Sequence, residues 1–394
     1  MGDGMNEEFQ AAAYSYIKEK LFFEKTGLIY DHIIKGREHE FPTSEEATRR
    51  FPNPCGYSTG MEDCMLSGGT MIDVCLIKYE RDGDKEAAIF AKKLAKGLLK
   101  CAFSAKTEGF LPRGVCPSDG ISHYPDSSRD QYTIFAFAIH RYLNSNICSV
   151  DERKEIARAA VDIAKRAERN VTEANGFDML TDEGKRTLVT VMWGDALGFH
   201  EFMRLPMLYL LAYEASGDVH WLTKYREIRE AAYLGSEKFG RVWSLYTLGQ
   251  MQSSLRLCYD VDPDTEWREK LYSLMCRVAE HAEGLVPRVR ESISLSDNYN
   301  PHVPDFHTLP MKPAERFIKL GYEDALSPIL PDANEYFMLQ DAAQIGITAG
   351  LVPGREPSAA AKEIVSYGIS KIDLKKHERN LPVYFLCAIT RTKS

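Results

Sequence analysis

Hydrophobic residues recur with a helical period along the whole chain, in segments of two alternating kinds. One kind is charged on one face and apolar on the other, as expected for a helix with one side in water. The other kind is apolar or small nearly all round, as expected for a helix surrounded by protein. The amphipathic segments are residues 7–23, 84–103, 151–170, 220–238, 265–283 and 358–372, and the apolar segments are residues 61–79, 129–143, 200–215, 245–259, 335–350 and 382–390. We find no alternating pattern that predicts a strand.

The connections between these segments differ in length according to their direction. After an apolar segment the chain turns within a few residues, and residues 79–84, 213–218 and 259–264 repeat a Tyr, an acid and a closing Asp. Such an Asp caps the next helix, and Gly in such a turn permits a left-handed helix end. The passages into apolar segments include residues 24–60, 104–128, 171–199 and 284–334. Loops of this length are usually functional.

This alternation predicts an all-α fold in which six helical hairpins close into an (α/α)6 toroid. The apolar helices would form the inner ring and the amphipathic helices the outer ring. All the long loops then lie on one rim, at the N-termini of the inner helices. Helix N-termini carry a partial positive charge that suits an anionic group, so we expect the functional site on this rim.

The layout resembles the six-hairpin (α/α)6 toroids used by many glycoside hydrolases, uronyl hydrolases and polysaccharide lyases. The resemblance covers nearly the whole chain but includes no diagnostic motif of a characterised family. It implies a single toroid domain over residues 1–394 and an oligosaccharide substrate. A shared fold does not by itself establish function, which has to be inferred from the residues on the rim.

The amino-acid composition limits the classes of partner that the protein is expected to bind. The formal net charge is −8 and the basic residues are interleaved with acids, which argues against a nucleic-acid-binding surface. No apolar run is long enough to span a membrane. The first residues show no signal-peptide pattern, and a cytoplasmic or a periplasmic location stays open, as does the oligomeric state. The nine cysteines form no CxxC pair and are expected to be buried thiols.

The densest polar stretch, residues 109–132, leads into the second apolar segment. Ser128 is expected to cap this helix, and Asp130 in its first turn is either an ordinary stabilising acid or a catalytic one. Arginine binds carboxylates through paired hydrogen bonds, as a uronic acid would require. The candidates in this stretch are Arg113, His123, Tyr124, Arg129, Asp130 and Gln131.

A second cluster, Glu62 and Asp63, follows Thr59 at the entry to the first apolar segment. Thr59 with two acids is also an ordinary helix start, with Thr59 as its cap. If either acid faces Asp130 across the rim, the two form the carboxylate pair that glycoside hydrolysis uses.

A third cluster precedes the third apolar segment and contains Trp193, Asp195, His200, Glu201 and Arg204. Trp193 is a candidate stacking surface for a sugar or a core residue. His200 or Glu201 is a candidate acid or base, and Arg204 lies one turn deeper on nearly the same face.

Two weaker candidates lie further along the chain. Tyr246 and Gln250, one turn apart, either line the lumen or pack in the core. The segment 302–307 contains two His and one Asp at tight spacing, which metal sites and ordinary loops both show. We predict no metal site, and because no nucleotide-binding, serine-hydrolase or metalloprotease motif is present, no cofactor.

Three functions fit these residues. A glycoside hydrolase would use Asp130 with Glu62 or Asp63, and Asp195 or Glu201 could replace either member of the pair. A polysaccharide lyase would instead use a His or Tyr base, here His123 or Tyr124, while Arg113 and Arg129 neutralise a uronate. A non-catalytic carbohydrate-binding or scaffolding toroid would use the same clusters for binding alone.

Overall fold

The computed structural model describes residues 2–37, 40–187, 189–242, 244–295, 301–330 and 333–393. Within them, six long helices form the inner layer that the apolar segments predict. In chain order these are α3 (Cys64–Asp82), α5 (Arg129–Leu143), α7 (Arg204–Ser216), α9 (Tyr246–Val261), α13 (Ala333–Gly350) and α15 (Leu381–Thr392). Each helix packs against the next in this order, and α15 packs against α3, so the ring is closed.

The amphipathic segments form the outer layer. Its helices are α1 (Gly2–Tyr16) continued by the π-helical η1 (Ile17–Leu21), α4 (Lys85–Ala102), α6 (Val150–Asn170), α8 (Val219–Ser236), α10 (Thr265–Gly284) and α14 (Ala359–Ile369). Hydrogen bonds from Asn6 to Ser366 and from Gln10 to Thr390 join α1 to the last hairpin. The (α/α)6 toroid expected from the sequence is confirmed. No helix in the described part of the chain is long and apolar enough to cross a membrane.

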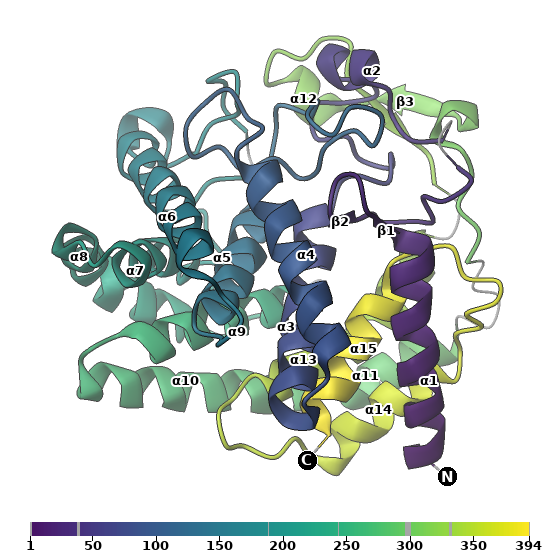
Figure 1. The fold of residues 1–394 in the computed structure, drawn as a ribbon. Coiled ribbons are helices and arrows are strands. Elements are labelled where there is room, and N and C mark those ends of the chain that lie inside the picture. Colours follow the sequence, from purple (N-terminus) through teal and green to yellow (C-terminus); the bar gives the residue numbers. More distant parts are fainter. Residues whose placement is uncertain are drawn as a thin grey trace.

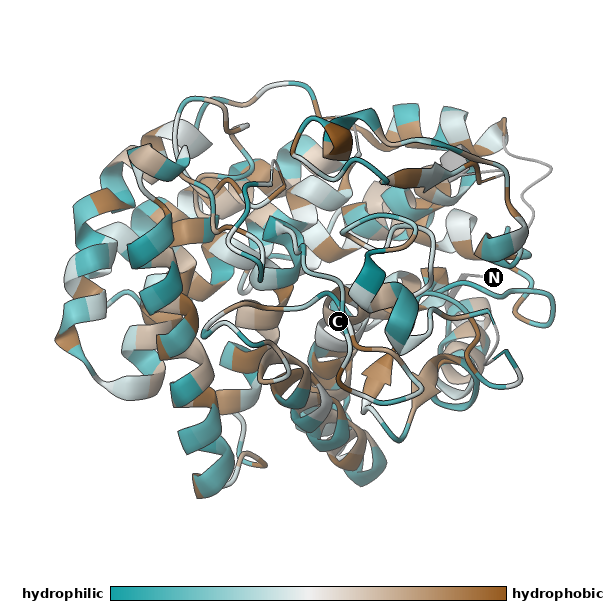
Figure 2. Ribbon diagram, turned by 90° about the horizontal axis from the view of Figure 1, so that it is seen from above, coloured by the Kyte–Doolittle hydropathy of each residue, from teal (hydrophilic) through white to brown (hydrophobic). Residues whose placement is uncertain are grey.

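The two ends of the toroid differ as expected (Figure 1). The long loops gather at the end opposite the two termini, and Figure 2 looks onto this loop-bearing end. The loops carry short elements: α2 (Ser44–Arg49), η2 (Glu173–Asn175), η3 (Phe306–Thr308) and α12 (Glu315–Ile318). A further helix, α11 (Val286–Ser294), packs against α13 and α14. The loops also contain two small antiparallel ribbons, β1 (Phe22–Phe23) with β2 (Leu28–Ile29) and β3 (Met311–Pro313) with β4 (Leu326–Pro328). The expectation of no strands was therefore wrong, because strands this short carry too few residues for an alternating pattern.

The opposite end is held by the acids of the repeated turns. Glu80 accepts a hydrogen bond from Arg141, while Glu214 and Asp260 both contact the imidazole of His140 at 2.7 and 3.3 Å. Burial opposes protonation of His140, but these two partners raise its pKa above the usual value. Glu80 and Glu214 therefore link α3 and α7 to their ring neighbour α5, while Asp260 links α9 to α5, which is not its neighbour in the ring.

Two helix starts differ from the expected ones. Helix α3 begins at Cys64, with Asp63 as its N-cap, and the Thr59 hydroxyl donates instead to the Gly56 carbonyl. Helix α7 begins at Arg204, so His200 and Glu201 lie in the turn before it. Ser128 is the N-cap residue of α5 as expected, but its side chain makes no capping hydrogen bond. Polar residues near a helix start therefore predict where the helix begins to within a few residues, but not the first helical residue itself.

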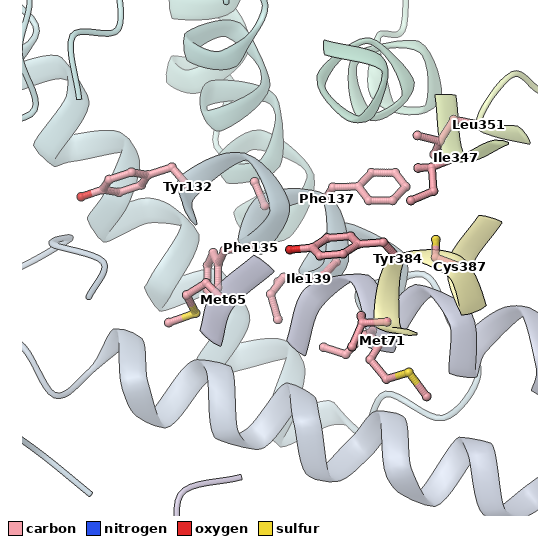
Figure 3. Close-up of a cluster of buried hydrophobic side chains, with 14 of the residues drawn as sticks. Met65, Met71, Tyr132, Phe135, Phe137, Ile139, Ile347, Leu351, Tyr384 and Cys387 are labelled. Carbon is pink, nitrogen blue, oxygen red and sulfur yellow. The ribbon is translucent and has the colours of Figure 1, made fainter. Parts of the chain in front are cut away.

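Apolar side chains fill the middle of the ring below the loops. Figure 3 shows this cluster, in which residues of α3, α5, α13 and α15 meet. Phe137, Ile347, Leu351, Tyr384 and Cys387 also line a small cavity of about 30 Å³. All nine cysteines are free thiols, and eight of them are buried. Apolar side chains thus occupy much of the space between the inner helices beneath the loop-bearing end.

Candidate active site

A cavity of about 440 Å³ opens at the loop-bearing end, which is in the size range of small-molecule sites. Its walls come from the N-terminal parts of five inner helices and from the loops that enter them. The residues discussed below that line it are Asp31, Tyr57, Glu62, Asp63, Arg113, Arg129, Asp130, Tyr246, Gln250, Arg316, Tyr336, Gln340, Gln344, Arg379, Asn380 and Tyr384. Acids lie on the wall made by α3 and α5, and amides on the wall made by α9 and α13.

Asp31 positions the two acids at the start of α3. One of its carboxylate oxygens accepts hydrogen bonds from the backbone N–H groups of Glu62 and Asp63, both at 2.9 Å. The other oxygen accepts from the Asn380 side chain at 3.1 Å. Asp31 thereby ties the loop before α3 to the loop before α15, and it fixes the backbone from which both candidate acids project.

The site shifts the protonation of these acids. Burial, followed by the charge of Asp63, raises the pKa of Glu62 to about 8. Burial also raises the pKa of Asp63, and the charge of Asp130 adds to this, while Arg113 opposes it. The Glu62 carboxylate still accepts a hydrogen bond from the Ser58 backbone N–H at 2.9 Å. At neutral pH the Glu62 carboxyl therefore holds a proton that it can donate.

Asp130 is in a different environment, although it lines the same cavity. Its carboxylate contacts the Arg204 guanidinium at 2.5 Å, and the Arg204 side chain is only 2% exposed. The charge of Asp130, followed by burial, raises the pKa of Tyr246. Gln131 donates to the Asp63 side chain at 3.0 Å and so connects the first turn of α5 to the acids of α3.

The two arginines expected to bind a uronate are held by protein groups. Arg113 is buried; it donates to the Tyr57 hydroxyl at 3.0 Å and to the backbone carbonyls of Glu62 and Ser127. Arg129 pairs with Glu201 at 2.5 Å and also donates to a loop carbonyl. Both guanidiniums line the cavity, but their strongest contacts brace its walls.

Several predicted site residues lie outside the cavity lining. His123 contacts Asp182 at 3.2 Å, and the Tyr124 hydroxyl donates to the Phe51 carbonyl, so both brace loops. Trp193 packs edge-on against Phe202. The other residues of that cluster also lie outside the lining. Asp195 is exposed, burial lowers the pKa of His200, Glu201 also accepts from the Gly198 backbone N–H, and Arg204 contacts Asp130 from behind the lining.

Other residues that line the cavity were not predicted. They include Asp31, Arg379 and Asn380 from loops, and Tyr336, Gln340, Gln344 and Tyr384 from the last inner helices. Gln340 and Gln344 repeat the one-turn spacing that marked Tyr246 and Gln250, and that spacing could have found them. Asp31 lies in a long passage without a local pattern, so only its contacts reveal it.

The segment considered as a weak metal candidate makes protein contacts instead. His302 pairs with Glu378 at 2.8 Å, and His307 contacts Asp305 and Glu46. Within the described ranges, no group of three or more His, Cys, Asp or Glu side chains is arranged to hold a metal ion.

Comparison with known proteins returned structural neighbours only. The sequence matches no family model and no curated protein. Over 100% of this chain, the fold is similar to the structure of the GH76A α-1,6-mannanase from Salegentibacter sp. HEL1_6, with 11% identity, 99% of that chain covered and a TM-score of 0.47. It is similarly related to an inactive variant of that enzyme with two aspartates changed to asparagine, in complex with α-1,6-mannotriose, with 10% identity, 99% coverage and a TM-score of 0.46.

Proposed function

We propose that this protein is a glycoside hydrolase that cleaves an oligosaccharide in the cavity at the loop-bearing end. The observation that carries the proposal is the pair of carboxyl groups, Glu62 and Asp130, that line one cavity, the first with a raised pKa and the second in contact with the buried Arg204 guanidinium. Two carboxyl groups in one site, one of them able to donate a proton, are the arrangement that glycoside hydrolysis uses.

In the proposed reaction, Glu62 is the general acid. Its proton passes to the glycosidic oxygen as the bond from that oxygen to the anomeric carbon breaks. Asp130, held in place by Arg204, either attacks the anomeric carbon or removes a proton from the water that does. Asp63 neighbours Glu62 in sequence, and its negative charge raises the pKa of Glu62. Asp31 acts as a positioning residue through the backbone of both acids.

The lyase alternative has less support in this geometry. It relied on His123 or Tyr124 as the base, and both side chains are engaged in loop contacts away from the cavity. It also needed Arg113 and Arg129 to neutralise a uronate, and both are held by protein acceptors. A binding-only function remains the second candidate, since the same cavity could hold a sugar without turnover.

The test is turnover of a panel of neutral and uronate-containing oligosaccharides, measured as release of reducing ends. We expect activity in the native protein, and a loss of about 100-fold or more in Glu62→Gln and in Asp130→Asn. Asp151→Asn, a change of an acid that is 90% exposed on α6, is the control and keeps full activity. His123→Ala is also expected to remain active.

Two results would count against the proposal. Full activity in both cavity variants would show that these carboxyl groups do not perform the chemistry. Binding of an oligosaccharide without any turnover would favour the binding-only toroid.

A further inference from the structure

Three buried glutamines line the cavity opposite the acids. Gln250 on α9 and Gln340 and Gln344 on α13 are only 5%, 6% and 5% exposed. Helices α9 and α13 are neighbours in the inner ring, so the three side chains belong to one wall. The cavity is the space they share, and they reach it at successive depths because Gln340 and Gln344 are one turn apart.

These amides have unused hydrogen-bonding capacity. The side-chain oxygens of Gln250 and Gln340 are buried and accept no hydrogen bond from any described residue. A buried polar atom without a partner costs about 1–3 kcal/mol, so such atoms usually have a functional reason or a bound water. Gln252, on the same helix as Gln250, also has a buried side-chain oxygen without a partner among the described residues, but it lies outside the cavity lining, and its NH2 group donates to the carbonyls of Met275 and Thr348 at 2.9 and 3.1 Å.

The wall formed by the three glutamines carries no charge. The charged side chains that line the cavity come from other helices and loops and are of both signs, namely Asp31, Glu62, Asp63, Asp130, Arg113, Arg129, Arg316 and Arg379. A charged group on a sugar ring seated against the glutamines would therefore lose water without gaining a partner of opposite charge from this wall.

We propose that Gln250, Gln340 and Gln344 form a subsite that binds the hydroxyl groups of an uncharged sugar ring, which makes the substrate neutral at the catalytic position. This inference rests on the proposed glycoside hydrolase function and deepens it. Amide groups both donate and accept, so they match hydroxyl groups, which do the same. Tyr246 and Tyr336, from the same two helices as the amides, also line the cavity.

The first arm of the test is thermal stability, which needs no ligand. Gln250→Leu and Gln340→Leu are expected to keep or raise the melting temperature, because the buried side-chain oxygens that they remove accept no hydrogen bond from any described residue. Gln252→Leu is the matched control and lowers the melting temperature, since it removes two internal hydrogen bonds. A comparable loss in all three variants would show that the wall is structural and would overturn the proposal.

The second arm measures binding. A glycan array with neutral and uronate-containing oligosaccharides is probed with Glu62→Gln, which retains the Ser58 contact but cannot donate a carboxyl proton. We expect neutral glycans to bind, with affinity about two- to tenfold weaker for each added Gln→Leu change.

The outcomes separate this inference from the proposed function. Binding confined to uronate-containing glycans, or binding of neutral glycans that the glutamine changes do not weaken, would overturn the subsite while leaving hydrolysis possible. Neutral glycans that bind through the glutamines but are never cleaved by the native protein would support the subsite and count against the hydrolase. No binding to any glycan would overturn both.

Discussion

The raised pKa of Glu62 makes a specific prediction about stability as a function of pH. An acid with a native pKa of about 8, against an ordinary value of 4.5, keeps its proton in the folded state after the unfolded chain has released it. Between these two values the folded state binds more protons, so the free energy of unfolding falls as pH rises. Below pH 4.5 both states are protonated, and above about pH 8 neither is, so the effect is confined to this window.

The size of the effect follows from the width of the window. One proton bound preferentially by the folded state changes the free energy of unfolding by about 1.4 kcal/mol per pH unit. Over the window from 4.5 to about 8 this gives an upper limit of roughly 5 kcal/mol. Glu62→Gln removes the titrating group but retains an oxygen that can accept from the Ser58 backbone N–H. The variant is therefore expected to gain stability over the native protein as pH rises from 5 to 8.

The assay is urea unfolding of both proteins at several pH values across this window. Glu266→Gln, which changes a glutamate that is 76% exposed on α10, is the matched control and should follow the native protein. If Glu62→Gln and the native protein show parallel pH dependence, Glu62 is ionised in the folded state at neutral pH, and its assignment as the general acid is wrong.

Further predictions concern the framework of the site. Arg204→Met leaves the Asp130 carboxylate without its buried partner and should lower the free energy of unfolding by roughly 2–4 kcal/mol in urea titration. Burial opposes ionisation of Asp73, but its two arginine partners, Arg391 and Arg141, lower its pKa, so Asp73→Asn should destabilise at neutral pH and lose this effect as pH falls below 3.8. A side chain at Gly97 would overlap the Gly27 carbonyl, so Gly97→Ala should lower the melting temperature. The single domain that we propose for residues 1–394 predicts one calorimetric unfolding transition with no earlier partial one.

The hairpins could be predicted because each depends on a local pattern. An outer helix such as α6 has charged residues on one face, and an inner helix such as α5 is buried almost all round, so hydrophobic periodicity distinguishes them. The end of the toroid that holds the candidate site also follows from the sequence, because the long connections all lie at that end. Local patterns of this kind say little about loops, and the two short ribbons and the added helix α11 were not expected.

The site itself depends on contacts between distant segments. Asp31 and Asn380 are 349 positions apart and meet only because α15 closes the ring onto α3. Gln340 and Gln344 occur singly in an apolar helix, where a polar residue is as consistent with the core as with a ligand site. A dense polar loop also suggests site residues where the polar groups bind the protein itself. His123 and Tyr124 use their polar groups to hydrogen-bond neighbouring loops.

Proton NMR of a digest tests the central claim most directly, because it identifies the product as well as its release. The native protein is incubated with the oligosaccharide that it binds best, and the same sample with Glu62→Gln serves as the control. The proposal predicts new anomeric signals of saturated reducing ends in the native sample and none in the variant. Signals of an unsaturated sugar, or a spectrum unchanged by the native protein, would contradict it.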